Sequence, residues 1–324
     1  MFILNPSFKG EYVPKRALLI INRSSRSGTT DIEDCIERLR KRGIEIDERT
    51  PERPGDIAQL IKRHAAEVDC VIVGGGDGSM NAAAPALVET GLPLGILPMG
   101  TANDLARTLK IPTDVAQACD IIADGVLHQI DLGKVNGHHF FNVANIGLGV
   151  QVSDELSSEM KQRWGVLSYA RSLFTAIKSF RPFHAEIICD GFRQRVRSIQ
   201  IAVGNGRHYG GGMTVADQAT IDDSRFFLYS LEPLRLWDML KIAPALRFGS
   251  LDERHPVYLR HGKQIEIITR TARPITADGE FVARTPAKFE MLAGAVNVYV
   301  PANYFEEQQE MTNAAQKQSA TGSQ

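Results

Sequence analysis

Cysteine is scarce in this chain of 324 residues, which contains four: Cys35, Cys70, Cys119 and Cys189. They lie far apart, and no CxxC pair or accompanying histidine spacing suggests a zinc site. We therefore expect reduced and mostly buried thiols, as is usual in a cytoplasmic protein.

Long hydrophobic runs and an excess of one charge are also lacking. The best apolar runs, such as Ala17–Ile21, are far shorter than the roughly 18 residues of a membrane span. The first residues, MFILNPSFKG, show neither a basic leader nor a cleavage site, so no signal peptide is expected. Because 37 Lys and Arg balance 38 Asp and Glu, nothing indicates binding to nucleic acid. The expectation is a soluble, cytoplasmic protein.

Regular alternation of strand and helix patterns occupies the first third of the chain. The length suits about two domains, and 43% hydrophobic with 23% charged residues is ordinary globular composition. Short, continuously apolar strands separated by amphipathic helices predict a doubly wound, mostly parallel sheet. The expected strands are Ala17–Asn22, a piece around Ile44 and Ile46, Val68–Val73 and Leu94–Leu97; the expected helices are Asp31–Lys41, Pro54–Glu67, one after Gly78, Thr101–Leu109 and Asp114–Ala123.

After about Gly125 the pattern changes to many short strands, which indicates an antiparallel, sandwich-like β domain. Two helices, near Val152–Phe180 and Leu234–Phe248, interrupt it, and the tail from Glu306 is expected to be disordered. The expected strands are Gln129–Val135, His139–Ala144, Ala185–Cys189, Val196–Val203, Phe226–Leu231, Gln264–Thr269, Lys288–Met291 and Val296–Val300.

A glycine-rich segment, VIVGGGDGSMN at Val71–Asn81, is the sharpest local feature of the sequence. A buried strand ends in three glycines, and a helix is expected to begin near Ser79. Glycines let backbone N–H groups approach an anion closely, and the helix directs its positive end to the same place. The segment is neither a Walker loop nor a dinucleotide fingerprint, because no Lys-Ser/Thr follows and Ser79 occupies the last glycine position. It predicts a phosphate-binding loop.

A second loop of similar design follows the next strand in LGILPMGTANDLAR, residues 94–107. The strand ends at Pro98, Gly100 and Thr101 are expected to open a helix, and Asn103 and Asp104 are expected in its first turn. Two such loops at the carboxyl ends of neighbouring parallel strands enclose the crevice where α/β sheets bind nucleotides.

These two segments together resemble the diacylglycerol kinase catalytic family, which includes bacterial lipid kinases and sphingosine kinases. The resemblance covers about Ala17 to Pro301 and continues in FNVANIGLGV (141–150), WGVLSYARSLFTAIKSFRPF (164–183), GNGRHYGGGM (204–213) and the DGE of residues 278–280. It implies an α/β ATP-binding domain at 1–128, to which residues 300–308 return, and a β-rich domain at 129–299. Residues 309–324 remain as the disordered tail.

The resemblance also implies the roles of individual residues. ATP phosphates would be bound by Gly75, Gly76, Asp77, Gly78, Ser79 and Asn81, with Thr101, Thr50 and Asn22 as further nucleotide contacts. Glu280 would be the general base, with Asp278 beside it. Asp223, with the carbonyls of Thr220 and Arg225, would hold a structural Mg²⁺.

Two further arguments concern these residues. Carboxylates spaced as Asp278 and Glu280 would point to the same side of a strand, although a polar hairpin turn explains the same spacing. Two departures from the family pattern have structural consequences: Pro85 should kink or shorten its helix, and Ser224 replaces a common glycine, which costs about 1–2 kcal/mol where φ is positive.

The resemblance implies an ATP- and Mg²⁺-dependent kinase that phosphorylates a hydroxyl of a lipid, with diacylglycerol as the default acceptor and phosphatidic acid as the product. The enzyme would be cytoplasmic and peripheral to the inner face of the membrane, and a homodimer is left open. The basic, amphipathic segment 164–180 either contacts lipid or packs on the core, the second being favoured. A soluble kinase of the NAD kinase type and a non-catalytic lipid or nucleotide sensor are the alternatives.

Overall fold

The computed structural model describes residues 13–21, 29–53, 55–148, 181–205, 208–209, 213–214, 220–233 and 257–304. The expected helices at 152–180 and 234–248, Asn22 and the tail from residue 306 lie outside these described residues. The chain divides into two compact units. The first contains Met1–Asp131, Thr220–Asp222 and Ala293–Gln324, and the second contains Leu132–Ala219 and Asp223–Leu292.

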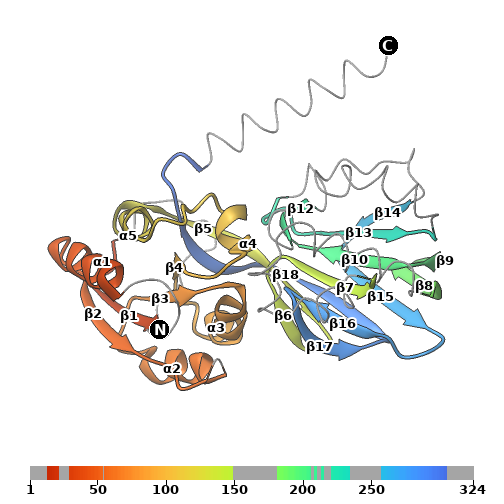
Figure 1. Cartoon of the computed structure of the whole chain (residues 1–324), viewed down its shortest axis with the longest axis horizontal. Coiled ribbons are helices and arrows are strands. Elements are labelled where there is room, and N and C mark those ends of the chain that lie inside the picture. The colour runs from red at the N-terminus through yellow and green to blue at the C-terminus, as the bar shows by residue number, and fades with distance from the viewer. Residues whose placement is uncertain are drawn as a thin grey trace, which may run out of the picture. The chain divides into compact units, whose positions relative to one another are not determined.

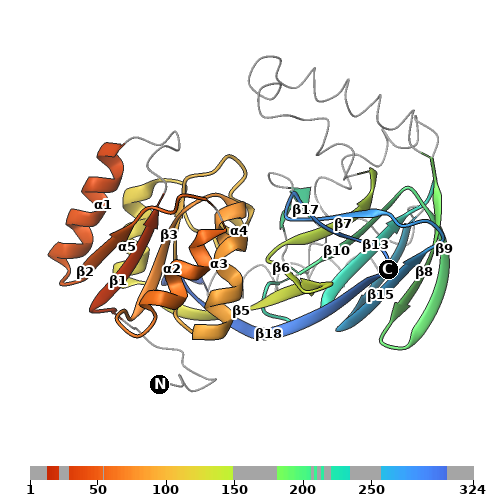
Figure 2. The ribbon, with the colours of Figure 1, turned by 90° about the horizontal axis from the view of Figure 1, so that it is seen from below.

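The first unit is built on a parallel sheet with the strand order β2-β1-β3-β4-β18. The strands are β1 (Arg16–Ile21), β2 (Glu45–Arg49), β3 (Cys70–Gly75), β4 (Leu94–Pro98) and β18 (Ala287–Val300). Helices cover both faces, with α1 beside α5 and α2 beside α3 (Figures 1 and 2). Because both faces are covered, β1, β3 and β4 are buried almost throughout, which explains their continuous apolar runs. The doubly wound, mostly parallel domain is confirmed.

The helices of this unit begin and end at residues suited to those positions. They are α1 (Thr29–Lys41), α2 (Asp56–His64), α3 (Asp77–Thr90), α4 (Asp104–Thr108) and α5 (Val115–Asp124). Asp114 caps α5 by accepting a hydrogen bond from the Gln117 N–H at 2.9 Å. α3 continues through the exposed Pro85 and ends at Gly91, whose φ of +70° suits glycine. The expected shortening at Pro85 was therefore wrong, and the alternative, a kink, stays a prediction.

Cys35 of α1 and Cys119 of α5 form a disulfide, with 5.9 Å between their Cα atoms. The expectation of reduced thiols was wrong for this pair. Cys70 and Cys189 are free and buried, as expected. The two bonded residues are 84 positions apart, so no spacing rule connects them. Only the packing of α1 against α5 brings them to disulfide distance.

The second unit is an antiparallel β sandwich. One sheet has the order β14-β13-β10-β7-β16-β17, and the other contains β18, β15, β8 and β9 in that order. Apolar side chains of both sheets form one core, including Ile146, Phe226, Ile187 and Phe289. The further strands are β5 (Val126–Val135), β6 (His138–Phe140), β7 (Val143–Gly147), β8 (Phe183–Cys189), β9 (Phe192–Ser198), β10 (Gln200–Gly204), β11 (His208–Tyr209), β12 (Met213–Thr214), β13 (Phe226–Leu231), β14 (Val257–Gly262), β15 (Gln264–Thr269), β16 (Pro274–Ala277) and β17 (Glu280–Arg284).

Several strand boundaries differ from those expected. The segments 139–144 and 196–203 each contain two strands, because the chain turns at residues 141–142 and at Ile199. Conversely, the two strands expected between 288 and 300 are the single strand β18. β14 was not expected from the sequence; it is an edge strand, and its residues Leu259, Arg260 and His261 are exposed. In the described part of the chain, no helix is long and apolar enough to cross a membrane.

Candidate functional site: a phosphate loop and an exposed carboxylate

The phosphate loop joins β3 to α3 in the first unit. Gly76 is the N-cap of α3 in an extended conformation, so the helix begins at Asp77, two residues earlier than expected. The Ser79 N–H donates to the Gly76 carbonyl at 3.0 Å. The first N–H groups of a helix have no partner inside it, and at this end they carry the positive pole of the helix dipole. The loop therefore presents the kind of helix terminus at which anions commonly bind.

Close packing explains why glycines occupy this loop and its neighbour. A Cβ on Gly75 would lie 2.3 Å from Ser79 Oγ, and a Cβ on Gly76 would lie 3.0 Å from Gly100 Cα. The reverse contact is tighter still, since a Cβ on Gly100 would approach Gly76 Cα to 2.5 Å. The two loops therefore meet backbone to backbone, and side chains at Gly76 or Gly100 would force them apart.

Asp77 and Asn103 fix the two loops. Asp77 Oδ1 accepts a hydrogen bond from the Leu105 N–H at 3.1 Å and so links the start of α3 to α4. Asn103, in a left-handed conformation with φ of +49°, accepts from the Gly100 N–H and donates to the Gly100 carbonyl, both at 2.9 Å. The helix after the second loop thus begins at Asp104, three residues later than expected.

A shallow, open depression lies between these loops. Its walls are formed by Gly75, Gly76, Asp77, Met80, Ile96, Pro98, Asn103, Leu105 and Ala106.

The other expected nucleotide contacts of the first unit lie near the same edge of its sheet. Thr50 follows β2 and Thr101 follows β4, and both are exposed. Because β1 to β4 are parallel, their carboxyl ends share one edge. Asn81, in the second turn of α3, has a buried Oδ1 with no hydrogen-bond partner among the described residues. A donor from a ligand or a water molecule would satisfy this oxygen.

Asp278 occupies a two-residue hairpin turn between β16 and β17 in the second unit. Asp278 and Gly279 have φ of +45° and +89°, the signature of a type I′ turn. The Asp278 carboxylate accepts hydrogen bonds from three successive backbone N–H groups, those of Phe141, Asn142 and Val143, at 2.7, 3.0 and 2.8 Å. Asp278 therefore fastens the hairpin to the start of β7.

Glu280 is the first residue of β17 and is exposed, in register with Ala277 of β16. Its neighbour Phe281 is 60% exposed. The expectation that Asp278 and Glu280 project from the same side of a strand was wrong, because Asp278 lies in the turn and the alternation of a strand does not apply to it. The hairpin explanation of the DGE spacing is therefore correct for Asp278. Glu280 is exposed on the strand and can contact a substrate.

The expected Mg²⁺ ligands lie where the chain passes between units. Asp223 Oδ1 accepts from the Arg225 N–H at 3.1 Å, and Arg225 Nε lies 3.7 Å from Asp223 Oδ2. Ser224 has a φ of +58°. At a positive φ a serine in place of glycine costs free energy, as expected from the sequence. Thr220 belongs to the first unit, whereas Asp223 and Arg225 belong to the second.

The sequence did not reveal the cluster around His128. In the first unit, Asp222 Oδ2 lies 3.0 Å from Nε2 of the buried His128, whose ring packs against that of Tyr304. Burial raises the pKa of Asp222, but hydrogen bonds from His128 and Thr220 outweigh it, so the pKa of Asp222 is below its usual value. Nothing in the sequence connects residues 128, 222 and 304, because they are joined only by folding.

A parallel nucleotide-type sheet with a glycine phosphate loop, followed by a β sandwich, defines a kinase-like protein of two domains. Residues 16–135 match the family model of the diacylglycerol kinase catalytic domain, and residues 142–300 match that of the YegS C-terminal NAD kinase beta sandwich-like domain. A protein of Pseudomonas syringae pv. syringae (strain B728a), provisionally named a YegS-like lipid kinase, is 31% identical over 292 residues, which are 89% of this chain and 94% of that protein. The chain therefore belongs to the diacylglycerol kinase family of lipid kinases and is a kinase.

Two further relatives agree with this assignment. A diacylglycerol kinase of Bacillus subtilis (strain 168) is 28% identical over 296 residues, 89% of this chain and 97% of that enzyme. A crystal structure from Bacillus anthracis str. Sterne, provisionally named a diacylglycerol kinase, has a TM-score of 0.78 at 25% identity and covers 90% of this chain and 98% of its own. The lipid kinase expectation is confirmed at the level of the family.

Proposed function

We propose that the chain transfers the γ-phosphoryl group of ATP to a lipid hydroxyl, with diacylglycerol as the acceptor and phosphatidic acid as the product. The observation that carries the ATP half of this proposal is the close backbone contact between Gly76 and Gly100 beside the N-terminus of α3. The acceptor half rests on the names of the relatives.

The first unit's loops bind the triphosphate in this proposal. Backbone N–H groups of Asp77 and Gly78 donate to phosphate oxygens, since they are the first of α3. Asn81 would donate from its side-chain NH₂ group to a phosphate oxygen, because phosphate oxygens only accept hydrogen bonds. Ser79, Thr50, Thr101 and Asn22 complete the contacts. Mg²⁺ bound with ATP would neutralise phosphate charge; carboxylate oxygen is its preferred ligand type, so Asp77 would hold that ion. Asp223, with the carbonyls of Thr220 and Arg225, would hold the structural one.

Glu280 is proposed as the general base. Its carboxylate takes the proton of the acceptor hydroxyl while the oxygen forms a bond to the γ-phosphorus and the bond to ADP breaks. An exposed glutamate at the start of a strand can meet a substrate that arrives from outside, and the fixed Asp278 turn holds its backbone. Asp278 thus contributes position, not proton transfer.

A lipid acceptor brings the enzyme to a membrane surface. Its hydroxyl lies at the level of the lipid headgroups, so we propose peripheral contact with the inner face of the membrane by an otherwise cytoplasmic enzyme. This contact needs only the acceptor's head region to reach Glu280.

The deciding experiment supplies [γ-³²P]ATP and Mg²⁺ to the full chain with matched acceptors. Detergent micelles containing diacylglycerol, ceramide or sphingosine are compared with NAD⁺ in the same buffer, and Glu280→Gln serves as the inactive control. The proposal expects labelled phosphatidic acid with diacylglycerol and far less product with the others. Transfer to NAD⁺ without lipid would contradict the lipid acceptor, and transfer to a sphingoid base alone would contradict diacylglycerol.

A further inference from the structure

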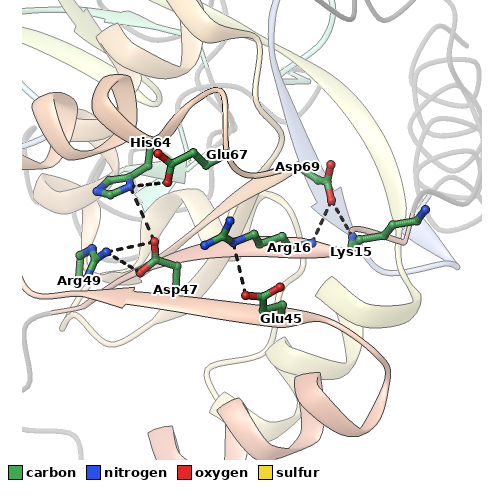
Figure 3. A network of polar contacts seen from close by, with 8 residues as sticks. All are labelled: Lys15, Arg16, Glu45, Asp47, Arg49, His64, Glu67 and Asp69. Carbon is green, nitrogen blue, oxygen red and sulfur yellow. Dashed lines mark hydrogen bonds and ion pairs between the residues drawn. The ribbon is translucent and has the colours of Figure 1, made fainter.

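Three potential metal ligands converge on the first unit, away from the phosphate loop. Asp47 lies in the middle of β2, His64 is the last residue of α2, and Glu67 follows in the turn toward β3 (Figure 3). In the described part of the chain this is the one group of at least three His, Cys, Asp or Glu side chains whose ligand atoms all lie within 4.8 Å of one another.

The distances suit a single bound ion. His64 Nδ1 lies 3.3 Å from Glu67 Oε2 and 3.7 Å from Asp47 Oδ2. A tetrahedral centre with Zn–N and Zn–O bonds of about 2.0–2.2 Å separates its ligand atoms by about 3.3–3.6 Å. The two distances from His64 Nδ1 are therefore close to those of such a site, and the two carboxylate oxygens lie within 4.8 Å of each other.

Burial favours a built site over a chance meeting of surface chains. The side chains of His64 and Asp47 are only 13% and 12% exposed, so two of the three ligands are held in place. Glu67, at 55% exposure, can adjust to close the site. Figure 3 shows all three pointing toward one another, whereas Glu45 on the same strand points to Arg16 and Asp69 accepts from the Lys15 and Arg16 N–H groups.

The charge of the cluster also suits a cation. Arg49 Nη2 lies 3.0 Å from Asp47 Oδ1, donates a hydrogen bond to Asp47 Oδ2 at 3.3 Å, and neutralises one of the two carboxylates. With neutral His64 the group keeps one negative charge. A protonated His64 between two carboxylates would satisfy the same geometry, and the experiment below separates the two explanations.

We propose that Asp47, His64 and Glu67 bind a divalent transition-metal ion of the zinc class. Imidazole nitrogen with two carboxylate oxygens suits Zn²⁺, Co²⁺ or Ni²⁺, whereas Mg²⁺ prefers oxygen ligands and keeps its waters. The ion would tie the edge strand β2 to the end of α2 and so brace the strand that leads to Thr50. This site is separate from the phosphate loop and from the proposed Mg²⁺ sites.

The test uses full-length protein stripped with EDTA and exchanged into chelator-free buffer. Titration with ZnCl₂ by calorimetry should give one equivalent of saturable binding, and a thermal melt should shift upward with ZnCl₂ but not with MgCl₂. CoCl₂ should give the visible absorption of tetrahedral Co²⁺. His64→Ala and Glu67→Gln should each weaken Zn²⁺ binding at least about tenfold.

Two control variants test whether loss of binding is specific to the three ligands. Glu45→Gln removes a carboxylate from the same strand without touching the three ligands, and His261→Ala removes an exposed histidine from the second unit. Both should bind Zn²⁺ as the wild type does. Circular dichroism should confirm that His64→Ala is folded, and Glu67→Gln, at an exposed turn, provides a second variant if it is not.

Loss of binding in the His64 and Glu67 variants alone would support the site. Absence of saturable Zn²⁺ binding would overturn it and leave a protonated His64 ion pair. Equal binding by wild type and His64→Ala would also overturn it, because the ion would then lie elsewhere in the chain. Kinase activity is not needed for any of these readouts, so failure of the proposed function would not affect them.

Discussion

At the scale of single residues, backbone contacts decide what each acidic side chain can do. The Asp278 carboxylate accepts hydrogen bonds from the N–H groups of residues 141–143, and Asp77 Oδ1 accepts one from the Leu105 N–H. Glu280, two residues after Asp278, is exposed. Chemically similar residues are therefore held differently, and a carboxylate that accepts hydrogen bonds from several N–H groups is costly to release.

Glu280 and Asp278 can be distinguished by replacing each with its amide. Glu280→Gln should reduce phosphoryl transfer about 10²–10⁴-fold without affecting stability, because Gln cannot take a proton. Asp278→Asn should instead lower the free energy of unfolding by about 1–3 kcal/mol, since its NH₂ group would face a backbone donor. Urea unfolding and steady-state turnover measure the two effects. Near-normal turnover by Glu280→Gln would remove it from the role of base.

Gly76→Val should abolish ATP binding while the protein stays folded. The added side chain would meet the Gly100 backbone, where a Cβ alone already lies at 3.0 Å, and would open the phosphate loop. Equilibrium binding of a fluorescent ATP analogue measures the effect. Gly55→Ala is the matched control, because a Cβ there meets nothing within 4 Å and its φ is helical. Unchanged nucleotide affinity in Gly76→Val would move the site elsewhere.

At the scale of elements, a few long-range contacts hold segments that are remote in the sequence. The disulfide joins α1 to α5, and ion pairs of Arg38 with Asp120 and of Arg42 with Asp124 run along the same pair of helices. Asp222 similarly joins a short segment from the middle of the chain to β5 through His128. The exposed ion pairs add little by themselves, so the covalent bond dominates the first contact.

Thiol counting tests the disulfide directly. Unreduced, denatured protein should show two reactive thiols, Cys70 and Cys189, and reduction should raise the count to four. In the native state Cys70 should react slowly, because burial raises its pKa and the thiolate is the reactive form. Four thiols without reductant would contradict the bond.

Replacing Cys35 and Cys119 together by Ser should lower the free energy of unfolding by roughly 2–4 kcal/mol, as expected for closing a long loop. Denaturation by urea provides the measurement. Reduced wild type is the internal control, because it should lose most of the same stability. If reduction changes nothing, the bond contributes no stability.

Asp222 should make stability depend on acidic pH. Its folded pKa is lowered, so its contribution is complete above the unfolded value of about 3.9 and is lost as the pH falls through the lower folded value. The difference in unfolding free energy between wild type and Asp222→Asn should therefore be largest near neutral pH and shrink below about pH 4.

At the scale of the whole molecule, the first unit is discontinuous in the sequence. Residues 293–304 supply the buried Val298 and Tyr304, and Val298 of β18 pairs with Leu94 of β4. The sheet of the first unit is therefore complete only when β18, from the last part of the chain, pairs with β4. Bringing residues so far apart in the sequence together costs loop-closure entropy, which the contacts made by β18 offset.

A fragment of residues 1–131 should accordingly fail to fold. It lacks β18 and leaves β4 as an unpaired apolar edge, which favours aggregation. Adding residues 293–304 through a flexible linker should restore a cooperative thermal transition, whereas a scrambled version of those residues should not. A sharp transition in the 1–131 fragment alone would show that β18 is dispensable.

Much of the fold and part of the candidate site could be predicted from residue patterns. Continuous apolar runs identified β1, β3 and β4, and the glycines of residues 74–78 identified a tight loop between β3 and α3, because strand burial and close backbone approach leave strong local signals. The helix starts were displaced by two or three residues, since Gly76 and Asn103 cap through backbone conformation and not through a typical side-chain signal. The nucleotide and catalytic assignments stay predictions.

The sequence by itself determined the doubly wound sheet, the β-rich second half, the glycine-rich loop between β3 and α3 and the lipid kinase family, because each depends on local pattern or on motifs in order. The tertiary structure alone decided the Cys35–Cys119 bond, the Asp222–His128 contact, the anchoring of Asp278 and the convergence of Asp47, His64 and Glu67. These contacts join residues whose separation along the chain carries no signal. Folding brings such side chains together through packing and backbone geometry, which no local pattern of residue types encodes.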